Sequence, residues 1–193
     1  MRIKNKVLMG SIACIIAACL WGISGATGQY LFKFTGVTPE WVVSTRTLFV
    51  GIIMLTYLQL THGGIFEIWM NKEDRKDIII FSLVGMLFTQ YGYFAAKKYC
   101  NAATATVLQY TAPILIVIYL AVKNRKLPTL VETAAVIGCL AGTVLLATHG
   151  DLKNLSLSPQ ALFWGLISAV ALAFYTIYPA RLLTKYDTKM LIG

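Results

Sequence analysis

The residues of this sequence that could do chemistry are neutral hydrogen-bonding and aromatic side chains inside long apolar runs. Gln90 and Tyr93 lie within one helical turn of each other, and Gln109 and Tyr110 follow in the next run. A buried amide carries several donors and acceptors that hydrocarbon cannot satisfy, so glutamines in two separate runs favour a polar cavity with aromatic walls. Such a cavity suits a small organic molecule better than a bare ion. The predicted substrate-binding set is Trp21, Ser24, Arg46, Gln90, Tyr93, Gln109, Tyr110 and Tyr175.

These polar side chains also have a purely structural interpretation, because hydrogen bonds between membrane helices hold bundles together. Arg46 has two interpretations as well. It lies near the outer end of the second apolar run, so it either extends outward past Trp41 or points inward to a substrate carboxylate. The sequence leaves both questions open.

Residue patterns typical of catalytic sites are absent from the sequence. It has no HExxH, no GxSxG and no Gly-rich loop ending in Gly-Lys-Ser/Thr, which argues against a metalloprotease, a serine hydrolase or an ATP-driven motor. Its four cysteines form no CxxC pair and have no flanking histidines, so they predict neither a disulfide framework nor a zinc site. We therefore predict no enzyme, no catalytic residues, no metal and no cofactor.

The elements that must position these side chains are membrane-spanning helices. Apolar residues make up 58% of the 193 positions and charged residues only 13%, with a mean hydropathy of +0.69. The charges separate uncharged runs of about 20 residues, the length that a helix needs to cross a bilayer. This pattern predicts an all-α polytopic membrane protein with about six transmembrane helices. The predicted helices are Val7 to Phe32, Trp41 to Leu60, Ile78 to Ala96, Ala102 to Val122, Leu130 to Thr148 and Pro159 to Leu183.

Small residues and one proline predict how these helices pack. Ala134, Gly138 and Gly142 recur at four-residue spacing, a stripe that lets helix backbones approach closely. Gly22 gives the first helix a packing groove or a hinge. Pro113 removes a hydrogen bond within the fourth helix and predicts a kink there.

Basic residues are unevenly divided between the two sides of the predicted helices. Twelve Lys and Arg residues fall on the side of the N-terminus and four on the other, which predicts a cytoplasmic N-terminus. The net charge of +9 is therefore a topology signal, and we predict no nucleic-acid partner.

The basic start followed by an apolar run to Cys19 also resembles a lipoprotein signal peptide. Because that run continues to Phe32, an uncleaved first helix explains more of the sequence.

Several short motifs occur in a particular order along the chain. They are Leu20-Trp21-Gly22, then Arg46, then Ala103-Thr104-Ala105-Thr106-Val107-Leu108-Gln109-Tyr110-Thr111-Ala112-Pro113, then the Gly138 and Gly142 stripe. Together they resemble the N-terminal repeat of EamA-type transporters in the drug/metabolite transporter superfamily. The segment from Thr148-His149-Gly150 to Tyr175-Thr176 resembles a bacterial subgroup of that family.

This resemblance implies ten helices in two five-helix repeats of opposite topology, packed around a central cavity. Residues 1–150 would form one repeat and residues 151–193 would begin the second, so we expect a partial sequence whose partner is a missing C-terminal half or a second copy. The predicted function is transport of small organic metabolites or amino-acid-like solutes by alternating access in the bacterial inner membrane. The rival interpretations are a non-transporting membrane scaffold or assembly partner and, more distantly, a membrane-embedded enzyme.

Overall fold

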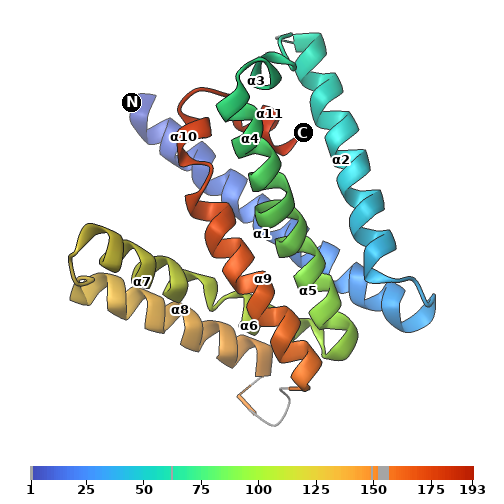
Figure 1. The fold of residues 1–193 in the computed structure, drawn as a ribbon. Helices are drawn as coiled ribbons and strands as arrows, with labels where there is room; N and C mark the ends of the chain where they lie inside the picture. Colours follow the sequence, from blue (N-terminus) through green and yellow to red (C-terminus); the bar gives the residue numbers. More distant parts are fainter. Residues whose placement is uncertain (1, 62, 149, 152–156) are drawn as a thin grey trace. The chain divides into compact units, whose positions relative to one another are not determined.

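Helices follow one another along the chain in the computed structural model, which describes residues 2–61, 63–148, 150–151 and 157–193 (Figure 1). These described ranges contain no strand. His149 of the motif above and Lys153 of the charge count lie outside them. The chain divides into two units, Met1–Val37 and Thr38–Gly193.

The first unit is a single helix, α1, which covers Arg2–Phe34. Large apolar side chains are exposed along it, among them Leu8, Ile15 and Ile23. Thr27 does not interrupt this surface, because its hydroxyl donates to the carbonyl of Ile23 at 2.9 Å. A helix that is apolar on every face is typical of a membrane span.

The second unit begins with two long helical rods. Its first elements are α2 (Pro39–Thr61), α3 (Glu67–Met70), α4 (Lys72–Ile80), the π-helical segment η1 (Phe81–Leu87) and α5 (Phe88–Tyr99). The turn after α2 uses Gly63 and Gly64 at φ of 70° and 75°, values that glycine adopts without strain. From α4 to α5 the chain is one continuous rod. Asn71 starts it by accepting hydrogen bonds from the backbone N–H groups of Glu73 and Asp74.

This rod begins at Lys72, six residues before the predicted start at Ile78. The sequence-based boundary is wrong because a run of charged residues is typical of a loop. Here the acidic members of that run bind basic side chains near the end of the chain, as described below, and the segment is helical. The extra helical turns lengthen the third span to Lys72–Tyr99.

The fourth predicted helix is interrupted in the structure. Helix α6 covers Ala102–Gln109 and α7 covers Ala112–Asn124, with Pro113 in the first turn of α7. A proline ring collides with the carbonyl four residues earlier, which is that of Gln109, so the α-helix ends there. The break lies one turn ahead of the proline.

Helix α8 (Leu130–Thr148) follows α7 across a short loop. Thr129 and Glu132 start it as a reciprocal cap. The Glu132 carboxylate accepts from the Thr129 backbone N–H at 2.8 Å, and the Thr129 hydroxyl accepts from the Glu132 N–H at 3.2 Å. The acidic residue at this helix end therefore has a local role in capping.

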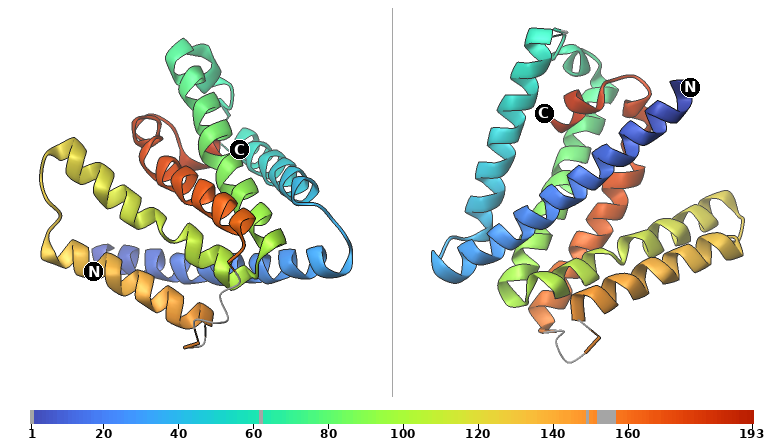
Figure 2. Two further views of the ribbon diagram at one scale, coloured as in Figure 1. Left: turned by 60° about the horizontal axis from the view of Figure 1, so that its bottom comes forward. Right: turned by 180° about the vertical axis from the view of Figure 1, so that it is seen from behind.

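The chain then enters α9 (Pro159–Ile177), α10 (Ala180–Leu183) and α11 (Thr188–Ile192). Helix α9 is central to the second unit, because it contacts η1, α5, α6 and α7 (Figures 1 and 2). Close approach is possible at Gly165, where a Cβ would lie 2.6 Å from Leu108 Cδ1. It is also possible at Gly92, where a Cβ would lie 3.1 Å from Ser168 Cβ.

The described residues include five helices that are long and apolar enough to cross a membrane. They are Leu8–Phe34, Pro39–Thr61, Lys72–Tyr99, Ala102–Asn124 and Pro159–Leu183, and a shorter apolar helix covers Leu130–Leu145. Each of these six segments overlaps one of the six predicted helices. The prediction of an all-α polytopic membrane protein is confirmed.

Candidate functional site

The second unit contains a cavity of about 480 Å³ between α2, η1 and α11. Its volume is in the range of small-molecule sites, and most of its lining is apolar. Its lining residues are Arg46, Thr47, Val50, Leu55, Ile65, Phe66, Ile68, Trp69, Ile78, Ser82, Met86, Leu87, Gln90, Tyr175 and Met190 to Gly193.

Three of the predicted binding residues lie in this cavity lining, and each comes from a different helix. Arg46 belongs to α2, Gln90 to α5 and Tyr175 to α9. Gln90 continues a row with Ser82 and Met86, because residues four apart share one face of a helical rod. The lining thus combines one cation, one amide and the hydroxyl groups of Thr47, Ser82 and Tyr175 with aromatic and thioether walls. Among the described lining residues, no side chain is acidic.

Tyr175 is held in place by the π-helical segment. Its ring stacks on that of Phe81 with centroids 5.2 Å apart, and a Cβ at Gly85 would lie 3.4 Å from the Tyr175 Cα. Helix α9 therefore passes closely over η1 at this level. π-Helical turns occur often at functional sites, and this one lies directly beside the cavity.

Two other predicted binding residues hold helices together in this structure. Gln109 is 3% exposed and donates through Nε2 to Ser168 Oγ at 2.7 Å, and Ser168 donates onward to the carbonyl of Thr89 at 3.0 Å. This chain of hydrogen bonds joins α6, α9 and α5. Tyr93 is also buried, with its hydroxyl 3.1 Å from Thr106 Oγ1. Neither Gln109 nor Tyr93 lines the cavity.

The remaining predicted residues lie in other places. Tyr110 is 43% exposed at the end of α6 and is not a lining residue. Trp21, Ser24 and Gly22 belong to α1 in the first unit. A Cβ at Gly138 or Gly142 would meet nothing within 4 Å, whereas the close helix approaches occur at Gly92 and Gly165. The packing stripe on α8 thus stays a prediction.

A network of ion pairs lies at one end of the second unit and was missed by the sequence-based prediction. Arg181 donates to Asp74 Oδ1 at 2.9 Å, to Asp77 Oδ2 at 2.7 Å and to Glu73 Oε2 at 3.2 Å. Lys185 donates to Asp74 Oδ2 at 3.1 Å. The available signal was the clustering of three of the eight acidic residues between positions 73 and 77.

Two tyrosines complete this network. Tyr178 donates to Asp77 at 3.1 Å, and Tyr186 donates to Asp74 at 2.9 Å. Burial raises the pKa of Tyr186, and the bond to Asp74 raises it further, so the hydroxyl stays protonated as a donor at neutral pH. The network joins α4 to the segment that follows α9.

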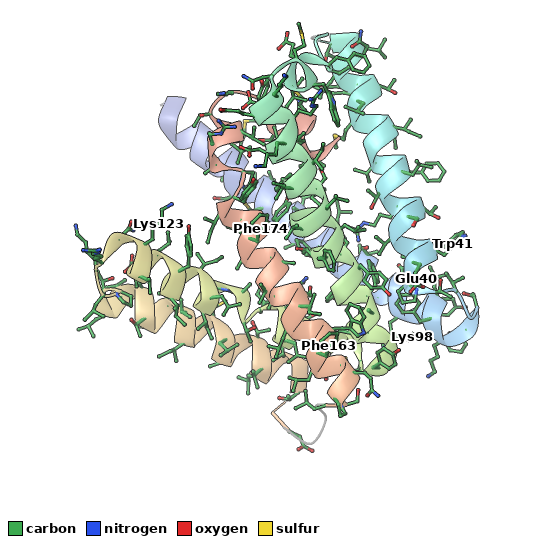
Figure 3. All side chains as sticks on the ribbon, in the orientation of Figure 1. Glu40, Trp41, Lys98, Lys123, Phe163 and Phe174 are labelled. Carbon is green, nitrogen blue, oxygen red and sulfur yellow. The ribbon has the colours of Figure 1, made fainter. Side chains whose placement is uncertain are left out.

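A smaller polar cluster lies where α2 begins and α5 ends. The Tyr91 hydroxyl donates to Glu40 at 2.9 Å, and its ring meets that of Trp164 edge to face with centroids 5.2 Å apart. Glu40 also interacts electrostatically with Lys98, and Figure 3 shows the two side chains near each other. This cluster connects α2, α5 and α9 at the end of the second unit that lies away from the Asp74 ion-pair network.

Lys97 and Cys100, at the end of α5, were also missed. Lys97 is 4% exposed, although it is one of two adjacent lysines and reads as a solvated charge in the sequence. The thiol of Cys100 donates to the carbonyl of Ala96 at 3.1 Å, and burial raises its pKa to about 11. In the described part of the chain, no group of three or more His, Cys, Asp and Glu side chains is placed to hold a metal ion.

Comparison with known proteins identifies the family of this chain. The model of the EamA-like transporter family matches residues 8–148. The chain is also 40% identical over 184 residues to a protein of Salmonella typhimurium (strain LT2) named as an uncharacterized inner membrane transporter, YicL. That alignment covers 95% of this chain and 61% of the relative, so the chain spans less than two thirds of the relative's length. No solved structure matches.

Proposed function

The chain belongs to the EamA-like transporter family, and on this premise we propose that it moves small organic metabolites or amino-acid-like solutes across the bacterial inner membrane by alternating access. Its apolar helices make it a multi-pass membrane protein surrounded by lipid. The inner membrane is the location named for its relative from Salmonella. Family membership favours a transporter over an enzyme.

The observation that carries this proposal is the cavity beside Arg46, Gln90 and Tyr175. An arginine and an amide inside a membrane bundle are costly unless they line a polar or water-filled space. The aromatic and thioether walls would accept the apolar part of a solute, and the polar groups would orient its other end. The preferred solute is therefore amphipathic.

We further propose that this bundle works together with a second set of helices, either a C-terminal half or another copy. Large apolar side chains are exposed on α7 and α8, among them Ile118, Val122, Val131 and Ile137. Lipid or partner helices would cover them equally well.

The excess of basic residues near the N-terminus, and near Lys72 and Lys185, supports a cytoplasmic location for the end that holds the ion-pair network.

The test of transport is solute flux in membrane vesicles from cells that produce the protein. We expect uptake or efflux of at least one radiolabelled amino acid or small amphipathic metabolite above that of vesicles lacking the protein. Gln90→Leu should abolish this flux. The matched control is Gln59→Leu, since Gln59 is exposed on α2 and does not line the cavity. Flux that is equal in wild type and Gln90→Leu would contradict the cavity assignment.

A membrane scaffold is the alternative function, and the hydrogen bonds of Gln109 and Tyr93 favour it. Those bonds join helices and need no solute. A scaffold predicts that no tested solute changes the thermal unfolding midpoint of the purified protein. A transporter with this cavity predicts stabilisation by its solute, because a ligand that binds only the folded state raises the free energy of unfolding.

A further inference from the structure

Lys97 is buried, whereas the adjacent Lys98 is exposed. The Lys97 ammonium lies 5.2 Å from the ring centroid of Tyr93 and 5.0 Å from that of Phe94, so two aromatic faces attract the charge. It also lies in the last turn of α5, where the helix dipole favours a cation. The two rings and the helix end therefore offset part of the cost of removing this positive charge from solvent.

A second cation lies close to the first. Arg46 on α2 interacts electrostatically with both Lys97 and Tyr93 of α5. Arg46 lines the cavity, and Gln90 and Lys97 are seven residues apart on one face of α5. Lys97 thus lies about 10 Å along the helix from Gln90, beyond the cavity lining.

This pair of like charges gives one end of the cavity a positive potential. Two cations at low dielectric repel each other, and an anion placed between or beside them reverses that unfavourable energy. The carboxylate of Glu40 is directed to Tyr91 and interacts with Lys98. Asp74 and Asp77 bind Arg181 at the other end of the unit.

We propose that Arg46 and Lys97 together select a solute that carries a negative charge, such as an organic carboxylate. Arg46 contacts the anionic group directly, and Lys97 adds positive charge from the next turns of α5. The apolar part of the solute lies against the aromatic wall that includes Trp69 and Tyr175. This inference rests on the proposed function and specifies the charge of the transported molecule.

The test uses three probes that share an aromatic tail and differ in the charge of the head group. They are 3-phenylpropionate, 3-phenylpropanol and 3-phenylpropylamine, titrated calorimetrically at neutral pH into the protein in detergent. We expect the wild type to bind the carboxylate at least about tenfold more tightly than the alcohol, which is the size of one charge-assisted hydrogen bond. The amine should bind most weakly.

Three variants connect this preference to Lys97. Lys97→Gln should weaken carboxylate binding by about fivefold or more, since it removes a charge near the anion. Lys97→Arg should retain the preference, because it keeps the positive charge at this position. Lys98→Gln is the matched control and should bind like the wild type.

The inference is overturned if the alcohol or the amine binds as well as the carboxylate, if the carboxylate does not bind, or if Lys97→Gln and Lys98→Gln behave alike. The last result would assign Lys97 to helix-end stabilisation only. Flux of an uncharged or cationic solute in the vesicle experiment would leave the transport proposal intact while contradicting this one, so the two can fail separately.

Discussion

Asp74 accepts a hydrogen bond from Arg181 at 2.9 Å across 107 residues of sequence. Asp74 is 1% exposed and also binds Lys185 and Tyr186, while Arg181 also binds Asp77. These contacts connect the start of the third membrane span to the end of the Pro159–Leu183 span and to the residues that follow it. They explain why a charged run that reads as a loop is the first part of a helix.

The Asp74 network should contribute to thermal stability. Asp74→Asn removes the carboxylate that Lys185 and Tyr186 share, so we expect the unfolding midpoint in detergent to fall by roughly 3–8 °C. Glu73→Gln is the control, because the Glu73 pair with Arg181 is exposed and such pairs contribute little. Equal midpoints for the two variants would show that burial of Asp74 is unimportant.

Helix packing should be sensitive to volume at Gly165 and insensitive at Gly138. An alanine Cβ at Gly165 would lie 2.6 Å from Leu108 Cδ1 and 2.7 Å from its Cβ, so Gly165→Ala should destabilise by about 1–3 kcal/mol. Gly138→Ala meets open space, and we expect no loss. Reversible unfolding in mixed micelles measures the free energy of unfolding of both variants. If Gly165→Ala leaves that free energy unchanged, α6 and α9 can move apart without cost.

The two glutamines should have different roles. Gln109→Leu breaks the bond to Ser168 and should lower the free energy of unfolding by about 1–3 kcal/mol. Gln90→Leu should leave stability nearly unchanged and remove solute binding. Unfolding and binding measured on the same two purified variants would test this division, and a stable Gln109→Leu would argue against it.

Cys100 should react as a half-buried thiol with a raised pKa. With a pKa of about 11, its thiolate fraction at pH 8 is smaller than that of a free cysteine by about two orders of magnitude. In a variant that retains only this cysteine, alkylation by iodoacetamide should rise about tenfold per pH unit from pH 7 to pH 10. A plateau above pH 9 would show an ordinary exposed thiol.

Much of the fold follows from hydrocarbon-length runs, because six apolar segments must be helices in a bilayer. The interruptions were harder to predict. Pro113 indicated the break in the fourth helix, and the steric clash with Gln109 places it one turn earlier. The helical extension at Lys72 depends on Arg181, far along the chain, and no local pattern reveals that pairing.

Only part of the candidate site could be predicted, because no local pattern shows which side chains meet across helices. Composition marks polar residues inside spans, but in apolar helices no amphipathic pattern shows which face each residue occupies. The cavity is lined by Arg46, Gln90 and Tyr175. Gln109 instead donates a hydrogen bond to Ser168, and nothing in the sequence marks this serine as its partner. Lys97 was missed because its burial depends on tertiary packing around it.

Solvent access to the cavity tests the central claim most directly. In a background without the four native cysteines, Gln90→Cys and Gln109→Cys would each be exposed to a charged, membrane-impermeant methanethiosulfonate reagent. We predict that the cysteine at position 90 is labelled and that a bound solute protects it, while the cysteine at position 109 is not labelled. Labelling of neither residue, or of both at equal rates, would contradict a water-filled solute path beside Arg46 and Gln90.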